Sequence, residues 1–532
     1  MSKEPEAVQF LSSNNEQHLE NSGILDENSL ASLVKKLGKD TLAYIPSFLV
    51  RAIVGFLFVI IITRIFSPAE YGVYALAIST IGIILLLISS WIQQSTLRYR
   101  TEFKEEEKLG HFNRHLLALF LIVSALLIIL AAAAYPIFRA VFTEYQRFYW
   151  PSVGCILTSF WFTNLCYILI ADLRPATYSL FIASNSILAF GIALLWIFLI
   201  QRDVMGIIYG LLFSDAILLM PLFLSTRFLY REENRNKEEL DESTYNLSAF
   251  AKKFAFYGFP MIGWFAGVLV LNMSDRYLIQ LFRGSAEVGI YSSNYTIAIS
   301  IFGLICAPLG YASHALLLKA GVSRNANKQQ IQRMVTAFSR YYLLLAIPVL
   351  TFMIVCAKDI SSILLGADYR KGYIVIPIIL LGCLAWNLSM YGQKGHELEE
   401  RTRTMFIYVA ICALVNIILN LFFIPWLGYV GAAITTLIGF SLYPILIYYN
   451  SRKGIAWKIP WRSLLTISVA SAGMALVIIL FKVFVPLRSN VASLLTAGAI
   501  GVVVNGLLIY LLKEIKASEW QFVKALLRVP VV

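Results

Sequence analysis

Residues 65–74 read IFSPAEYGVY, and residues 282–291 read FRGSAEVGIY. The two stretches share Ala-Glu, Gly and Tyr at the same spacing, so that Gly72 corresponds to Gly289. Each copy stands between two long apolar stretches, the first and second of a set of six. Because an even number of crossings separates the copies, both halves cross a membrane in the same direction. The repeat therefore predicts two parallel halves related by an axis along the membrane normal.

The composition places the chain in a lipid bilayer. Of its 532 residues, 59% are hydrophobic and 14% are charged, and the mean hydropathy is +0.72. A water-soluble protein needs more polar surface than this balance supplies. Runs of about 20 nearly uncharged residues, the length that crosses a bilayer as a helix, number about fourteen. The predicted fold class is an all-α polytopic membrane protein with two parallel six-helix lobes and two C-terminal helices.

Basic residues outnumber acidic ones, with 44 Lys and Arg against 31 Asp and Glu and a net charge of +13. Such a balance can indicate nucleic-acid binding. Most basic residues outside the spans, however, fall in segments on the same side as the N-terminus, which is what the positive-inside rule predicts for cytoplasmic segments. We expect an inner-membrane protein with both termini in the cytoplasm and no nucleic-acid partner.

The longest polar stretch after the N-terminal tail separates the two halves and predicts a cytoplasmic linker. Near each end of the chain, a short amphipathic segment suits a helix that lies in the membrane interface. The expected segments are an N-terminal tail with an interfacial helix (1–43), an N-terminal lobe (44–228), the linker (229–255), a C-terminal lobe (256–450), two C-terminal helices (451–512) and an amphipathic tail (513–532).

The sequence carries no motif for catalysis or metal binding. The five His residues are scattered over tails and loops, no HExxH, P-loop or GxGxxG motif occurs, and the six Cys residues form no CxxC pair. Ser67, Pro68 and Glu70 fit a capping box with proline at the first helical position, which gives the repeated motif a structural role. We expect no enzyme activity, no catalytic residues, no cofactor and no metal.

Three stretches carry a family resemblance: TRIFSPAEYGVYALA (63–77), SDRYLIQLFRGSAEVGIYSSNYTIA (274–298) and NLFFIPWLGYVGAAITTLI (420–438). Together they are similar to the polysaccharide-transport branch, which includes Wzx-like O-antigen flippases, of the multidrug/oligosaccharidyl-lipid/polysaccharide (MOP) exporter superfamily. The likeness runs from about Leu42 to Lys513. It implies two lobes that face each other as a V, and the two extra C-terminal helices match the longer members of the superfamily.

The same resemblance implies a role in lipopolysaccharide or exopolysaccharide assembly. Such a flippase moves an undecaprenyl-diphosphate-linked oligosaccharide, for example an O-antigen repeat unit, from the cytoplasmic to the outer leaflet by alternating access. Its expected partners are this substrate, the lipid bilayer and a glycan polymerase or chain-length regulator. The oligosaccharide needs a polar path through the membrane, because burying an unpaired hydroxyl in hydrocarbon costs about 2–7 kcal/mol.

Ionisable side chains inside apolar spans are costly, and so they are the first candidates for substrate contacts. Arg51 lies in the first span, where it could contact the diphosphate or extend to the cytoplasmic headgroups. A polar band in the seventh and eighth spans could bind sugar hydroxyls or hold helices together by hydrogen bonds. Its members are Asn272, Asp275, Arg276, Asn294 and Tyr295.

Basic residues near the cytoplasmic ends of the spans could form a vestibule that attracts the anionic lipid head, or they could only follow the positive-inside rule. They are Arg98, Arg100, Arg174, Arg340 and Lys394. Asp215 and Asp275, one acid in each half, are candidates for ion coupling. For Asp215, a partner that fixes helix packing is the stronger interpretation.

Two other functions stay open on the sequence alone. A cation-coupled multidrug exporter of the same superfamily would use a buried carboxylate, which either acid could supply. A multispanning glycan polymerase or transferase would need acidic, His or Arg residues on a sizeable external loop. The longest external connection, near Lys358–Lys371, is short for that purpose.

Overall fold

The computed structural model describes residues 45–106, 108–226, 246–322, 328–399, 401–452, 454–485, 487 and 489–515. Within these ranges the chain forms helices and no strand. The tail expected at 1–43, most of the linker expected at 229–255 and most of the tail expected at 513–532 lie outside the described residues.

Long helices joined by short turns make up both halves of the chain. The first half consists of α3 (Ile45–Ile65), α4 (Pro68–Glu105), α5 (Leu109–Val141), η1 (Thr143–Tyr145), α6 (Gln146–Ala171), α7 (Pro175–Leu195), η2 (Trp196–Ile200) and α8 (Met205–Thr226). The second half consists of α9 (Leu247–Arg283), α10 (Ser285–Val322), α11 (Lys328–Val355), α12 (Ala357–Leu364), η3 (Ala367–Ile374), α13 (Val375–Gly392), α14 (Lys394–Leu398), α15 (Thr402–Leu427) and α16 (Tyr429–Ser451), followed by α17 (Trp461–Phe484) and α18 (Asn490–Leu511).

Helix length and composition confirm the predicted fold class. In the described chain, 13 helices are long and apolar enough to cross a membrane, and the bent helix α9 makes up to 14. Its two parts, Leu247–Phe259 and Ile262–Arg283, meet at 52°. Many large apolar side chains are exposed, including Leu199 and Val502 at 76% each. Exposed apolar side chains of this kind suit helices surrounded by lipid acyl chains.

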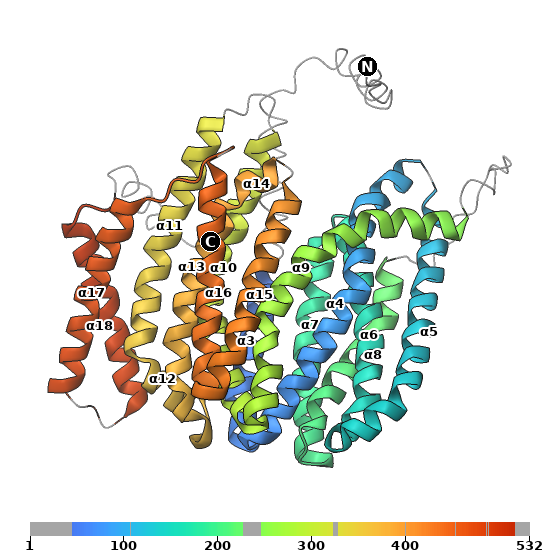
Figure 1. The fold of residues 1–532 in the computed structure, drawn as a ribbon, viewed down its shortest axis with the longest axis horizontal. Helices are drawn as coiled ribbons and strands as arrows, with labels where there is room; N and C mark the ends of the chain where they lie inside the picture. Colours follow the sequence, from blue (N-terminus) through green and yellow to red (C-terminus); the bar gives the residue numbers. More distant parts are fainter. Residues whose placement is uncertain are drawn as a thin grey trace, which may run out of the picture.

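Figure 1 shows two groups of helices, α4–α8 and α10–α18, with α3 and α9 between them. Equivalent helices make equivalent contacts: α7 packs on α3 and α8 as α15 packs on α9 and α16. Likewise α6 packs on α8 as α13 packs on α16. The repeat in the sequence is thus a repeat in the fold. We call α3–α8 the first lobe and α9–α16 the second lobe, which α17 and α18 follow.

The two ends of the molecule differ. The end at which α3 leads into α4 and α9 leads into α10 carries both copies of the repeated sequence, and we call it the motif end. The opposite end carries Thr226 and Asn246, the described residues that border the linker, and we call it the linker end. The two groups of helices lie close together at the motif end and diverge toward the linker end (Figure 1).

Helix α9 begins at Leu247, inside the segment expected to be linker and ahead of the predicted span start at Phe256. Asn246 caps it, because its side-chain oxygen accepts a hydrogen bond from the backbone amide two residues later. Phe250 and Phe254, one turn apart, are buried in an apolar cluster of the first lobe. Charged residues lie between these two phenylalanines, so the segment as a whole is polar and was predicted to be linker, although one of its faces is apolar.

The part of α9 before the bend packs on the first lobe, and the part after the bend also packs on α15 of the second lobe. Before the bend, Trp91 of α4 stacks on Phe259 with ring centroids 5.3 Å apart. After the bend, Gly267 lies against Val409 of α15. The bend is therefore located where the helix passes from the first lobe to the second.

The last two helices, α17 and α18, pack on α11 and α12 of the second lobe. At the motif end Lys482 forms an ion pair with Asp359 (2.5 Å), and at the linker end Arg340 forms one with Glu514 (2.8 Å). The helix pair expected at 451–512 is thus attached to the second lobe at both of its ends.

Candidate functional site

A buried carboxylate lies in the interior of the second lobe. Asp275 of α9 is fully buried and accepts hydrogen bonds from Tyr291 of α10 (2.6 Å), Asn420 of α15 (2.7 Å) and Thr436 of α16 (2.5 Å). Burying a charge without partners costs several kcal/mol, and these donors offset that cost. One side chain thus connects four helices.

Asn416 of α15 extends the cluster around Asp275. Its side-chain oxygen accepts hydrogen bonds from Ser274 and Asn420, both at 3.1 Å, while its buried amide nitrogen has no partner among the described residues. Hard cations prefer oxygen ligands of this kind. The cluster therefore has the donor set for a hard cation, although no group of three or more His, Cys, Asp and Glu in the described chain is arranged for a metal ion.

Arg276 points away from its neighbour Asp275. Its guanidinium donates to Ser292 (3.2 Å) and to the Asn272 carbonyl (2.9 Å), and it lies 5.2 Å from the centre of the Tyr295 ring. The Tyr295 hydroxyl in turn donates to the Asn272 side chain (2.9 Å). Arg276 is only 8% exposed, and none of the ion pairs of the described chain includes it. The hydrogen-bond partners of this charged side chain are thus all neutral, although the Asp275 carboxylate lies within its electrostatic reach.

Asn294 does not join Asn272, Arg276 and Tyr295. It is fully buried and donates to the Tyr369 carbonyl (3.0 Å), and its side-chain oxygen accepts a hydrogen bond from Ser361 (3.3 Å). These contacts fasten α12 and η3 to α10. These hydrogen bonds fit the second of the two roles that the sequence left open for Asn294, that of holding helices together.

The first lobe has its own buried acid. Asp215 of α8 is 4% exposed and accepts hydrogen bonds from Ser159 of α6 and from Asn185 of α7 (2.7 Å). It thus ties three helices together, in keeping with the packing role expected from the sequence.

Arg51 of α3 lies within electrostatic reach of Asp215. Its side chain is exposed, and a Cβ atom added one turn away at Gly55 would meet no atom within 4 Å. Arg51 therefore borders open space near the linker end of α3. Arg276 lies near the motif end of α9, so the two arginines stand at different depths in the bundle.

The five residues expected to form a basic vestibule each have a partner within the protein. Arg100 is buried and forms an ion pair with Asp172 (2.8 Å). Arg340 and Lys394 are 8% exposed and form ion pairs with Glu514 and Glu397. The Arg340 pair attaches the segment that follows α18 to α11, and the Lys394 pair lies within α14. Both side chains are thus already neutralised, which makes them poor candidates for substrate contacts. We therefore set Arg340 and Lys394 aside.

Arg98 and Arg174 keep the more accessible positions at the linker end. Arg98 stacks over the Tyr257 ring at 4.5 Å, and Arg174 donates to the Ser225 carbonyl (2.5 Å). Both guanidinium groups retain further donors, so they stay candidates for attracting an anionic head group.

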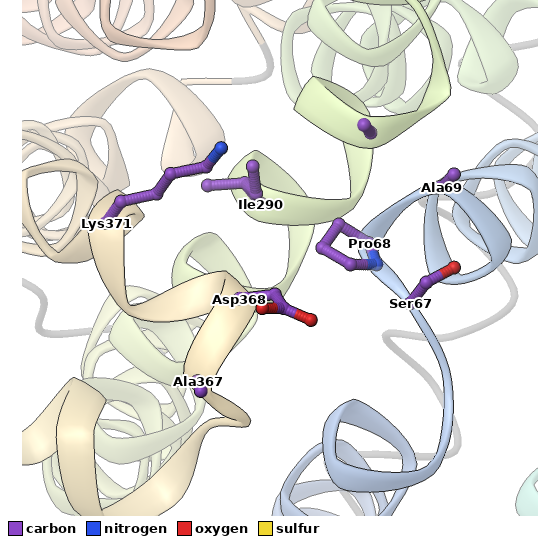
Figure 2. Close-up of a pocket in the computed structure, with 8 residues that line it drawn as sticks. Ser67, Pro68, Ala69, Ile290, Ala367, Asp368 and Lys371 are labelled. Carbon is purple, nitrogen blue, oxygen red and sulfur yellow. The ribbon is translucent and has the colours of Figure 1, made fainter.

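The motif end also holds a pocket that sequence reasoning missed. Its volume is about 410 Å³, and it lies where the starts of α4 and α10 meet η3 (Figure 2). Close by, the Tyr369 hydroxyl of η3 donates to the Phe66 carbonyl (2.9 Å), and Gly366 lies directly against the Thr63 carbonyl. These contacts join the second lobe to the end of α3. These contacts connect residues about 300 positions apart. Local sequence patterns do not predict contacts over such a separation.

The sequence model of one family, described as polysaccharide biosynthesis protein, matches residues 37–313, more than half of the chain. The chain belongs to this family. The resemblance noted in the sequence is thereby confirmed. The chain is 25% identical over 231 residues to the "Probable flippase AglR" of Haloferax volcanii. The match covers 42% of this chain and 47% of the relative, so the chain spans about half the length of that relative.

Solved structures share the fold of this chain. The lipid II flippase MurJ, in an inward closed conformation, is similar with a TM-score of 0.70 and 17% identity over 88% of this chain and 97% of that chain. An inward-facing multidrug resistance transporter of the MATE family in the MOP superfamily is similar with a TM-score of 0.60 and 13% identity over 76% of this chain and 93% of that chain. The expected superfamily fold is confirmed.

Proposed function

We propose that this protein is a flippase that moves a polyprenyl-diphosphate-linked oligosaccharide across the inner membrane, from the cytoplasmic to the outer leaflet, by alternating access. Arg276 carries the proposal. Its guanidinium lies inside a membrane span with no ion-pair partner in the described chain, next to Asn272 and Tyr295, whose polar groups suit sugar hydroxyls. A phosphate oxygen pair would satisfy the planar guanidinium in two parallel hydrogen bonds.

A second arginine supports the same substrate class. Arg51 lies in the other lobe, near the linker end, and borders open space. If the linker end faces the cytoplasm, as the positive-inside rule predicts, an entering diphosphate meets Arg51 before Arg276. The two arginines would then bind the anion at successive depths.

The physical demands of the substrate fit two lobes that separate. The polyprenyl tail gains about 0.8 kcal/mol per buried CH₂, so it stays in the bilayer while the polar head passes between the lobes. An inside-negative potential would favour outward movement of the anion by roughly 2.3 kcal/mol per charge per 100 mV. Closure at the motif end and divergence at the linker end correspond to a state that accepts substrate from the cytoplasm (Figure 1). The bend in α9 would let the lobes rock about each other.

Ion coupling belongs to the same proposal, with Asp275 as its first candidate and Asp215 as its second. The oxygen-rich surroundings of Asp275, which include Asn416 and Asn420, could exchange a cation for the hydrogen bonds of the described state. The same cluster favours the alternative function, a cation-coupled small-molecule exporter. The two functions differ in their cargo, which a transport assay distinguishes.

The test is leaflet exchange of a fluorescent polyprenyl-diphosphate oligosaccharide in proteoliposomes. Replacement of Arg276 by Gln removes a charge-assisted interaction worth about 1.5–3 kcal/mol, so the exchange rate should fall roughly tenfold to a hundredfold. Arg51→Ala should lower it as well. The matched control is Arg139→Gln, an exposed arginine at the motif end of α5, which should leave the rate unchanged.

Exchange in the wild type no faster than in empty vesicles would reject the flippase function. Accumulation of a small organic cation in the same vesicles would then favour the exporter. Wild-type rates in Arg276→Gln would remove Arg276 from the substrate path.

A further inference from the structure

Helices α4 and α10 cross at the motif end with their backbones in contact. A Cβ atom added to Gly72 would lie 1.9 Å from the Ser285 carbonyl oxygen, and one added to Gly289 would lie 1.9 Å from the Pro68 carbonyl oxygen. Both glycines are buried. Since the clashing atoms belong to the main chain, they cannot move aside as the end of a flexible side chain would. Only glycine allows this approach at either site.

The two glycines occupy equivalent positions in the repeated sequence. Gly72 of the first copy receives the start of the second copy at Ser285, and Gly289 of the second copy receives the start of the first copy at Pro68. The repeated stretches are therefore the two faces of one contact across the pseudo-twofold axis. We call this contact the glycine crossing.

Further contacts between the lobes surround the glycine crossing. Tyr145 of η1 accepts a hydrogen bond from Gln280 of α9 (3.0 Å), and Thr80 of α4 is hydrogen-bonded to Tyr277 of α9 (2.7 Å). In Figure 2, Pro68 at the start of α4 faces the side on which Ile290 and Asp368 lie, and all three residues line the pocket. The glycine crossing thus lies within the surface along which the first lobe meets the second at the motif end.

We propose that the glycine crossing is the latch that closes the motif end, and that its two glycines set how closely the lobes approach. A methyl group at either position would hold the lobes apart at this end and shift the resting protein toward a state open at the motif end. The inference rests on the proposed alternating access. It assigns a gating function to the repeated sequence, whose role was expected to be that of a helix start.

The test measures the distance between spin labels across the motif end, in nanodiscs of phosphatidylethanolamine and phosphatidylglycerol without substrate. Labels on Ala140→Cys at the end of α5 and on Lys358→Cys in α12 report on the two lobes, because both positions are exposed. The six native cysteines are buried and should react little. Gly72→Ala and Gly289→Ala should each lengthen the distance and lower the ratio of closed to open protein roughly tenfold or more.

The chain offers a matched control on each helix. A Cβ atom added at Gly82 of α4 or Gly303 of α10 meets nothing within 4 Å. Gly82→Ala and Gly303→Ala should therefore reproduce the wild-type distances while changing helix propensity by the same amount. Wild-type distances in both crossing variants would overturn the latch.

A crosslink tests the latch without altering either glycine. Ala69 and Ala286 are exposed, and both line the pocket of Figure 2. A disulfide or a short bismaleimide bridge between Ala69→Cys and Ala286→Cys should abolish leaflet exchange, and reduction of the disulfide should restore it. Undiminished exchange in the bridged protein would refute the latch. Distances that respond to the glycine variants in a protein that flips no polyprenyl-diphosphate lipid would support the latch and reject only the proposed cargo.

Discussion

The ion pair between Arg340 and Glu514 leads to a large and specific effect on stability. Both residues are only 8% exposed, and the Arg340 guanidinium donates to the Glu514 carboxylate (2.8 Å) and to the Glu514 main-chain oxygen. Replacing Arg340 with Met deprives a buried carboxylate of this counter-charge. Removing one partner from a buried ion pair costs about 3–5 kcal/mol, so Arg340→Met should lower the free energy of unfolding by that amount.

The double variant Arg340→Met with Glu514→Leu should recover most of this loss, because apolar side chains of similar volume can replace a buried ion pair at little cost. The assay is unfolding in mixed micelles followed by tryptophan fluorescence, with all four proteins of the double-mutant cycle. A loss below about 1 kcal/mol in Arg340→Met would refute the reasoning.

Leaflet exchange in the same four proteins distinguishes two roles of Arg340, a structural role in attaching the segment after α18 and a role in contacting the substrate. If the pair only fastens the segment after α18 to α11, exchange returns together with stability in the double variant. Recovered stability without recovered exchange would instead return Arg340 to the substrate path, as the sequence allowed.

Two further predictions concern single side chains. Asp275→Asn keeps an oxygen acceptor for Tyr291 but removes the charge, so the protein should fold while leaflet exchange no longer responds to a sodium or proton gradient; an unchanged response would reject Asp275 as the ion-coupling residue. Ser67→Ala breaks the capping box at the start of α4 and should lower the free energy of unfolding by about 0.5–2 kcal/mol, with Ser489→Ala at the cap of α18 as the matched comparison. Equal stability of Ser67→Ala and the wild type would show that the cap contributes nothing.

Local and periodic signals predicted much of the fold. Apolar runs located the spans, since a bilayer imposes both their length and their composition. The spacing of Ser67, Pro68 and Glu70 predicted a capping box, and the structure contains it: the Ser67 amide donates to the Glu70 carboxylate (2.8 Å). These features depend on neighbours in the sequence, which is why the sequence alone reveals them.

Features that depend on distant segments were not predictable in the same way. Asn294 and Arg276 lie at similar depths, yet they face different helices, and hydropathy carries no information about which side of a helix meets which neighbour. The partner of Arg340 likewise depends on where the segment after α18 docks. The start of α9 was missed because two buried phenylalanines, Phe250 and Phe254, stand among charged residues.

The contact at Gly72 and Gly289 uses main-chain atoms from both copies, so it makes no demand on the chemistry of any side chain beyond the absence of one. Residues deeper in the bundle can then change in charge, size or hydrogen-bonding capacity without disturbing the glycine crossing. Evolution could adapt the interior of such a protein to glycans of different composition while the mechanical part stayed the same. The residues that select the cargo and the residues that set the movement of the lobes would thus lie in separate parts of the chain.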